Sequence, residues 1–249
     1  MKRLIFIFAL LLCCSAVQAN ARGIMTMCGA GVPVAGCTTP TGDELTESFG
    51  EGSTSCWTSG SSVCDQTWVT TGTVSIEDTP ASAPSNTACA KSLKFDSTSA
   101  ASNGYHRLDA AIANNVAITI NFTMYIDSSS VAQYSDTRVF ALVNTAAMTS
   151  ANSIVAFGLN KPSAGSGSAT KMKAIVTDSC TIDFAEDTWY DVTLTMPASD
   201  AGDQSTLSVN GGAASCTFTK NTSASDYVYI GASGTGIVGY VGNLRITTP

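Results

Sequence analysis

Charge is scarce in this sequence, because only 12% of its 249 residues are Asp, Glu, Lys or Arg, about half the share of an ordinary soluble protein. The formal net charge is −7, and no Lys or Arg occurs from residue 23 to residue 90. A protein that binds nucleic acid needs a basic surface for the phosphates, so we expect no nucleic-acid partner. The composition also argues against a coiled coil or helical bundle, which needs Ala, Glu, Lys and Leu in quantity.

Histidine is nearly absent: His106 is the single histidine, and the sequence has no C-x-x-C pair. A structural zinc site uses Cys and His ligands at short spacing, so we expect none here. A Ser-His-Asp triad would depend on His106, and no serine lies in a G-x-S-x-G context. Ser and Thr are plentiful instead, with 31 and 32 residues.

The N-terminus has the pattern of a secretory signal peptide. Two basic residues at 2–3 precede an apolar run at 4–12, which is too short to span a bilayer. Small residues follow at cleavage spacing, so we predict a signal over 1–19, cut after Ala19 or Ala21, and a secreted protein. A lipoprotein signal acylated at Cys13 or Cys14 is the alternative. No later segment is long and apolar enough for a transmembrane helix.

Cysteine usage agrees with export, because cysteines outside the cytosol are largely disulfide-bonded. Seven remain after the signal. Their spacing predicts three pairs, and sequence alone leaves both the connectivity and the state of Cys89 open. The predicted pairs are Cys28 with Cys37, Cys56 with Cys64, and Cys180 with Cys216.

Period-two alternation dominates from residue 45 onward. In 116–127 the even-numbered residues are apolar, and most odd-numbered ones are polar, which predicts a strand with one buried face. We predict further strands over 45–49, 67–76, 92–95, 138–143, 154–159, 172–177, 180–184, 189–196, 206–210, 215–219, 227–231 and 238–246. Only Leu108, Ala111 and Ile112 hint at a helical turn. So many short strands predict an all-β antiparallel sandwich over 45–249, preceded by a cysteine-containing leader or linker over 20–44.

The last third of this domain resembles the concanavalin A-like lectin/glucanase superfamily, and laminin-G-like domains in particular. The resemblance lies in 189–194, 207–211, 229–231 and 239–246. It implies a jelly roll of two curved antiparallel sheets with neighbouring chain ends. The same pattern has a mechanical interpretation: Asn210-Gly211 closes a hairpin, and Tyr240, Leu244 and Ile246 face the core.

Glucanases of this superfamily carry two catalytic carboxylates on one strand, in an E-x-D-x-x-E or E-x-D-x-E signature. The nearest stretch, 181–186, has Thr181 in place of the nucleophile, so we expect Asp183 and Glu186 not to form a catalytic pair. A polysaccharide lyase on a jelly roll would need Arg, Gln, His and Tyr side chains in one cleft, and Tyr105-His106-Arg107 is the local candidate. His106 and Arg107 are adjacent in sequence, so in a strand they should face opposite sides.

Calcium is the usual ion of the superfamily. Oxygen-rich segments occur at 127–130 and 200–203, but neither matches a defined calcium loop. An Asp often precedes the Asn-Leu of the closing strand in related sequences, and this chain has Gly242 there. We therefore expect no cofactor, with calcium as the open alternative.

The sequence thus predicts a secreted, non-catalytic module that binds glycans or a cell-surface component. The expected binding residues are the polar row of the longest strand, Asn121, Thr123, Tyr125 and Asp127. Sugars are held by hydrogen bonds to polar groups and by packing on aromatic rings. The alternatives are a structural or decoration subunit of an extracellular or virion assembly, and a polysaccharide hydrolase or lyase. The oligomeric state stays open.

Overall fold

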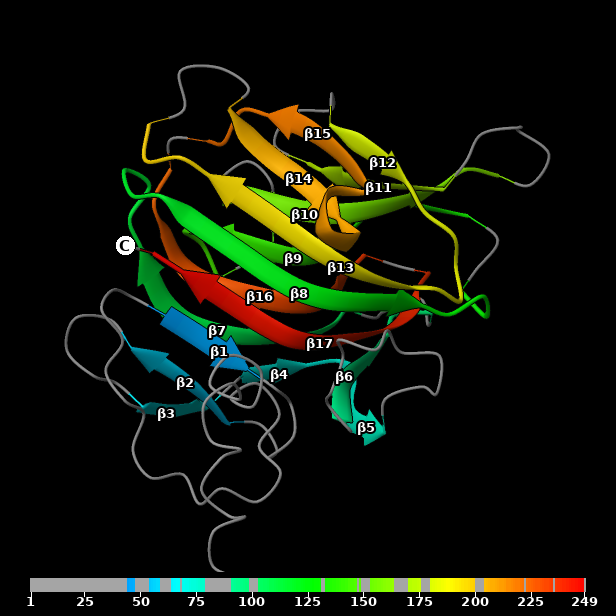
Figure 1. The fold of residues 1–249 in the computed structure, drawn as a ribbon. Helices are drawn as coiled ribbons and strands as arrows, with labels where there is room; N and C mark the ends of the chain where they lie inside the picture. Colours follow the sequence, from blue (N-terminus) through cyan, green and yellow to red (C-terminus); the bar gives the residue numbers. More distant parts are fainter. Residues whose placement is uncertain are drawn as a thin grey trace, which may run out of the picture.

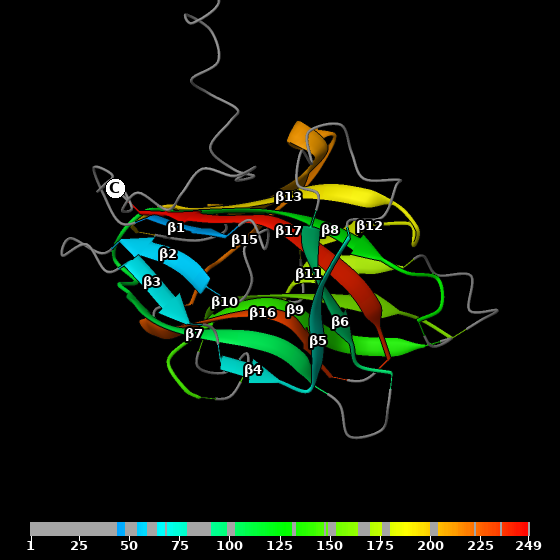
Figure 2. The ribbon, with the colours of Figure 1, turned by 90° about the horizontal axis from the view of Figure 1, so that it is seen from below.

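A computed structural model describes residues 44–47, 54–58, 64–67, 69–78, 91–98, 103–130, 133–146, 148, 153–163, 170–175, 180–199, 204–221, 223–234 and 236–248. In these residues the regular structure is β-strand, with one 3-10 turn at Asn210–Gly212. The strands form two antiparallel sheets, stacked in two layers (Figures 1 and 2). The predicted all-β sandwich is therefore confirmed. No helix in the described part of the chain could cross a membrane.

Sheet A is the layer that contains the longest predicted strand, β8 (Ile118–Ile126). β8 lies between β13 (Trp189–Met196) and β17 (Val238–Thr247). Beyond β13 lie β14 (Ser205–Val209) and β15 (Ala214–Phe218), and beyond β17 lie β1 (Glu44–Glu47), β2 (Thr54–Thr58) and β3 (Cys64–Thr67). β6 (Lys91–Asp96) also pairs with β17, and β5 (Thr73–Asp78) pairs with β6.

Sheet B forms the second layer. Its strand order is β12 (Thr181–Asp183), β11 (Lys171–Ala174), β10 (Ser153–Lys161), β9 (Tyr134–Val143), β16 (Ser225–Ser233), β7 (Gly104–Ile112) and β4 (Val69–Thr71). Neighbouring strands in both sheets run antiparallel.

The alternating pattern of β8 places one of its faces in the core, as predicted. Its apolar residues are all buried: Ile118, Ile120, Phe122, Met124 and Ile126. Phe122 crosses the interior to contact Phe140 of β9 and Phe157 of β10, with ring centroids 5.7 and 5.4 Å apart. Burial of these apolar side chains between the layers is the main stabilising contribution to such a sandwich.

Residues 104–112 correct the expectation of a helical turn, because they form strand β7. Leu108 and Ile112 are buried while Ala111 is exposed, and Ala110 is buried between them. Buried and exposed residues thus alternate with a period of two, as in a strand. β7 pairs with β16 on one side and with β4 on the other, and this pairing in sheet B fixes the strand conformation.

The strand predicted over 67–76 is divided between the two sheets. Gly72 adopts a φ of +73° between β4 and β5, and β4 joins sheet B while β5 joins sheet A. A Cβ at Gly72 would overlap the backbone oxygen of Asn103, so the corner requires glycine. Strands β2 and β3 were not predicted.

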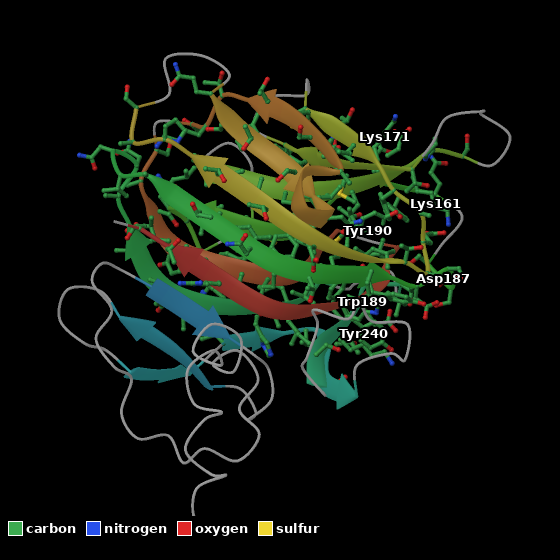
Figure 3. The ribbon with its side chains drawn as sticks, in the orientation of Figure 1. Lys161, Lys171, Asp187, Trp189, Tyr190 and Tyr240 are labelled. Carbon is green, nitrogen blue, oxygen red and sulfur yellow. A yellow bond between two sulfur atoms is a disulfide. The ribbon has the colours of Figure 1, made fainter. Side chains whose placement is uncertain are left out.

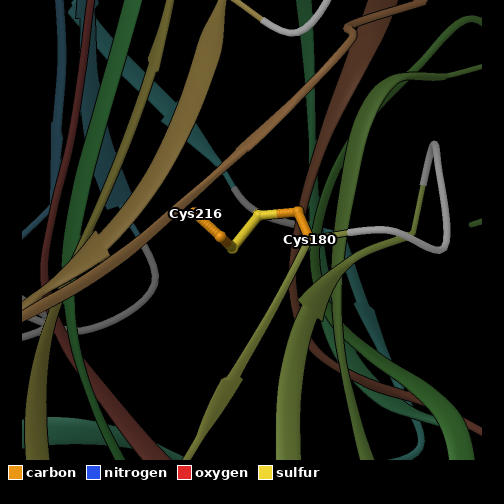
Figure 4. Close-up of a disulfide and its surroundings, with 2 residues drawn as sticks. All are labelled: Cys180 and Cys216. Carbon is orange, nitrogen blue, oxygen red and sulfur yellow. A yellow bond between two sulfur atoms is a disulfide. The ribbon is translucent and has the colours of Figure 1, made fainter.

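The predicted disulfide between Cys180 and Cys216 is confirmed (Figure 4). The two Cα atoms lie 5.3 Å apart. Cys180 precedes β12 at the edge of sheet B, and Cys216 lies on β15 at the edge of sheet A. The bond therefore closes one side of the sandwich covalently.

The other predicted disulfides stay predictions. Cys56 and Cys64 are register partners of the hairpin β2–β3, where the backbone alone is described. Cys28, Cys37 and Cys89 lie outside the described residues.

Candidate functional site

The predicted binding row lies on the outer face of sheet A, the face turned away from the core. Asn121, Thr123 and Tyr125 alternate on β8 with the buried apolar residues. Asp127 lies just beyond the strand, and its Oδ1 atom accepts a hydrogen bond from the Ser129 backbone N–H at 2.7 Å. The carboxylate of Asp127 therefore closes a local turn.

Three aromatic side chains lie side by side on this face, and we call Tyr240, Tyr125 and Trp189 the ring row. Tyr125 is the register partner of Trp189 on β13 and of Tyr240 on β17. The ring centroid of Tyr125 lies 5.5 Å from that of Trp189 and 5.9 Å from that of Tyr240. The ammonium of Lys94 on β6 lies 5.8 Å from the centre of the Tyr240 ring. Figure 3 shows Trp189 and Tyr240 at the end of sheet A where Asp187 also lies.

Tyr240 corrects the expectation that this residue faces the core. The register between β17 and β8 shifts between Gly242 and Arg245. Val241 and Leu244 are both buried, although strict alternation would put them on opposite faces. The irregularity therefore reverses the alternation and sends Tyr240 to the outer face beside Tyr125.

Three buried polar side-chain atoms of sheet A, one of them in the ring row itself, have no hydrogen-bond partner in the described part of the chain. Ser92 Oγ, Thr123 Oγ1 and Trp189 Nε1 are buried, and none has a hydrogen-bond partner in the structure as described. Their residues are 0%, 5% and 4% exposed. They lie on three strands of one sheet, and Gly242 of β17 is the register partner of Thr123. An unpaired buried polar group costs about 1–3 kcal/mol, so these atoms hold unused hydrogen-bonding capacity just beneath this face.

Exposed threonine hydroxyl groups cover much of the rest of this face, and we call them the hydroxyl field. Register connects one threonine from each of five adjacent strands, from β17 to β15, and each is partly or fully exposed. In order they are Thr247, Thr119, Thr195, Thr206 and Thr217. In the neighbouring row, Thr193 Oγ1 donates to Asn121 Oδ1 at 2.9 Å. The face therefore offers many hydroxyl donors and acceptors with few charges.

Asp187 fixes the end of the ring row. Its Oδ1 atom accepts from the Tyr125 hydroxyl at 3.0 Å and from the Ser128 backbone N–H at 2.9 Å. Hydrogen bonds from Ser128, with a smaller contribution from Tyr125, lower the pKa of Asp187 below its usual value. Asp187 has a φ of +57°, in a turn between β12 and β13. A charged acceptor in this turn therefore holds the Tyr125 ring in place.

Asp183 and Glu186, the two carboxylates of the segment 181–186, each pair with a different lysine. Asp183 forms an ion pair with Lys171 at the exposed edge of sheet B. Both oxygens of Glu186 accept hydrogen bonds from Lys161 Nζ, at 2.9 and 2.7 Å. The side chain of Glu186 is only 16% exposed, although the residue lies in the turn between β12 and β13.

His106 and Arg107 face opposite sides of β7, as predicted. His106 is 4% exposed on the core side, and burial lowers its pKa to about 4. Arg107 lies on the outer face of sheet B. Within the described ranges, no group of three or more His, Cys, Asp or Glu residues could hold a metal ion.

No protein-family profile matches this sequence, and no curated protein matches it. Solved structures with a similar fold are known. The binding domain of botulinum neurotoxin DC, in complex with rat synaptotagmin II, is 13% identical with a TM-score of 0.53, over 84% of this chain and 49% of that chain. The binding domain of botulinum neurotoxin serotype D is 11% identical with a TM-score of 0.52, over 83% of this chain and 48% of that chain.

This chain thus spans about half the length of the two matched chains. At such low identity the likeness shows the fold alone. A β-sandwich of this kind is consistent with the fold expected from the laminin-G-like resemblance.

Trp189, Tyr240, Lys94 and Ser92 were not among the predicted binding residues. Trp189 could have been found, because the alternation of Tyr190, Val192 and Leu194 already places it on the opposite face. Tyr240 could not, because its direction depends on the irregularity in β17.

Proposed function

We propose that this protein is an exported, non-catalytic module that binds neutral glycans on the outer face of sheet A. The observation that carries the proposal is the ring row beside three unpaired polar atoms, Ser92 Oγ, Thr123 Oγ1 and Trp189 Nε1. Pyranose rings present apolar C–H faces to aromatic rings and hydroxyl groups at their edges. The outer face of sheet A therefore offers aromatic rings for the C–H faces of a sugar and polar atoms for its hydroxyl groups.

The hydroxyl field supports an extended ligand. The threonine row crosses five strands, about 19 Å at the usual strand spacing of about 4.8 Å. The row is long enough to contact several sugar units, and it crosses β8 at Thr119, six residues from Tyr125 of the ring row and parallel to it. Ser and Thr hydroxyls both donate and accept, as sugar hydroxyls do.

The state of the acidic residues supports a binding role without catalysis. Retaining hydrolysis needs an ionised nucleophile beside a protonated acid, about 5 Å apart. Asp183 and Glu186 instead neutralise Lys171 and Lys161 on separate strands. The disulfide between Cys180 and Cys216 supports the predicted export, because such bonds persist in oxidising compartments.

A glycan array with the purified mature chain would test the proposal, followed by calorimetric titration of the best neutral hit. We expect Tyr240→Ala to weaken binding roughly tenfold, since an aromatic contact of about 1.4 kcal/mol corresponds to a factor of ten. Trp189→Phe keeps an aromatic ring but removes Nε1, and we expect a several-fold loss.

Tyr190→Phe is the matched control. Tyr190 is adjacent to Trp189 on β13, but its ring contacts Phe184 on the core side, and its hydroxyl accepts a hydrogen bond from the Ala185 backbone N–H at 2.9 Å. We expect this variant to bind like the wild type. Absence of array binding, or equal losses in Tyr190→Phe and Tyr240→Ala, would contradict the proposal.

A further inference from the structure

The outer face of sheet B carries a second aromatic cluster, remote from the ring row. Tyr229 of β16 is fully buried there with Ala141 and Ala156, and Tyr105 and Tyr227 pack against it. The Tyr229 ring centroid lies 5.1 Å from that of Tyr105 and 6.4 Å from that of Tyr227. The cluster lies outside the main core between the sheets.

Arg107 is the cation of this cluster. It is the register partner of Tyr229 on the neighbouring strand β7. Its guanidinium carbon lies 5.1 Å from the centre of the Tyr227 ring. Its Nε atom lies 3.2 Å from Asp109 Oδ1, with the Asp109 side chain 67% exposed and that of Arg107 25% exposed. The guanidinium is thus partly accessible, and its counter-ion is an exposed surface carboxylate.

Tyr229 supplies an unused hydroxyl beside this cation. The residue is 0% exposed, and its hydroxyl proton has no acceptor among the residues described, although the Arg107 guanidinium interacts with the hydroxyl oxygen. Burial raises the pKa of Tyr229, while the hydrogen bond from Arg107 and its charge oppose that rise. The phenol therefore stays protonated and can donate a hydrogen bond.

Small and apolar side chains lie on both sides of Arg107 and Tyr229. Ala141 and Ala156 extend the register row beyond Tyr229 on β9 and β10, and they place only methyl groups there. On the other side of Arg107 lies Val69 of β4, a large apolar side chain that is 47% exposed. An apolar rim thus borders the cation.

We propose that Arg107 and Tyr229 form a binding site for the carboxylate of an acidic saccharide on the outer face of sheet B. One carboxylate oxygen pairs with the guanidinium in place of Asp109, and the other accepts from the Tyr229 hydroxyl, which the rings of Tyr105 and Tyr227 must uncover by shifting when the ligand binds. Arginine is suited to this role because its planar donor fork matches a carboxylate. The tyrosine rings and Val69 accommodate the C–H faces of the sugar ring. This site does not depend on the proposed function of sheet A.

Calorimetric titration tests the proposal with two carboxylate probes, a galacturonic acid hexamer and 3′-sialyllactose. The neutral controls are the methyl-esterified hexamer and lactose. We expect at least one acidic probe to bind and its neutral counterpart to bind at least tenfold more weakly. Arg107→Gln should weaken the acidic probe at least tenfold, and Tyr229→Phe several-fold.

Asp109→Asn should have the opposite effect. It removes the internal competitor for Arg107, so we expect several-fold tighter binding of the acidic probe. Tyr229→Phe deletes a single buried oxygen whose proton has no acceptor among the described residues, so its thermal midpoint should stay close to that of the wild type. This variant separates loss of binding from loss of folding.

Lys171→Gln is the matched control for charge, because Lys171 is a cation near the far edge of the same sheet. It should leave the affinity unchanged, as should Tyr240→Ala on sheet A. The proposal is overturned if neither acidic probe binds, if the neutral probes bind equally well, or if Arg107→Gln and Tyr229→Phe bind like the wild type.

Discussion

Individual polar residues in this sandwich hold positions that apolar residues would normally occupy. His106 lies in the core face of β7, and Lys161 with Glu186 lies half-buried where β10 meets the turn before β13. The Tyr134 hydroxyl donates a hydrogen bond to Glu186 at 3.4 Å. Burial, together with the charge of Glu186, raises the pKa of Tyr134. Such groups make stability depend on protonation and on charge pairing.

The stability of the fold should fall with acidification through His106. Its folded pKa of about 4 lies below the ordinary 6.5, so between these values the unfolded chain binds more protons. The contribution is complete above pH 6.5 and is lost as the pH falls toward 4, by up to about 1.4 kcal/mol per pH unit. Urea unfolding of the wild type and His106→Leu across this range would measure it. An identical slope in both proteins would show that His106 is not responsible.

Glu186→Gln should destabilise the fold by about 1–3 kcal/mol, because it leaves Lys161 half-buried without its counter-charge. Asp183→Asn is the comparison, since it breaks an exposed ion pair with Lys171 and should cost less than about 1 kcal/mol. Chemical denaturation of both variants checks the difference. Equal losses would mean that burial of the Lys161 pair contributes nothing.

At the scale of elements, turns and irregularities direct the side chains of the binding face. The turn between β12 and β13 places Asp187 on Tyr125, and the shift in β17 sends Tyr240 outward. The hairpin β14–β15 closes at Asn210 and Gly211, with φ values of +49° and +67°, as the sequence predicted.

Two glycines with positive φ should respond differently to alanine. At Gly211 an added Cβ meets nothing within 4 Å, so Gly211→Ala should cost about 1 kcal/mol from backbone strain alone. At Gly231, with φ +121°, the Cβ would lie 2.4 Å from the Gly104 oxygen on β7. We expect Gly231→Ala to cost about 3–5 kcal/mol in a denaturant titration. Similar midpoints for the two variants would disprove the close approach of β16 to β7.

On the scale of the whole molecule, the two layers are joined by the core and, among the described residues, by a disulfide at their edges. β1 at the start of the described chain pairs with β17 at its end, so the two ends meet in sheet A (Figure 1). On the opposite side, Cys180–Cys216 connects the edge strand β15 to the segment before β12.

Replacing both Cys180 and Cys216 with alanine should lower the free energy of unfolding by roughly 3–4 kcal/mol. The bond closes a loop with a sequence separation of 36, and its loss restores that entropy to the unfolded chain. Urea unfolding without reductant would measure the change, and circular dichroism would verify that the sheets persist. An unchanged midpoint would mean that the bond adds nothing to the core packing.

The sequence by itself determined the class of the fold and the inward face of β8, because alternation is a local property of the chain. It also determined the separation of His106 from Arg107, and it suggested the Cys180–Cys216 pair, which the structure then confirmed. Only the tertiary structure decided that β4 and β5 separate at Gly72, that Tyr240 turns outward, and that Arg107 lies beside Tyr229. These features depend on the registers of strands far apart in the sequence, and no local pattern specifies which strands will pair.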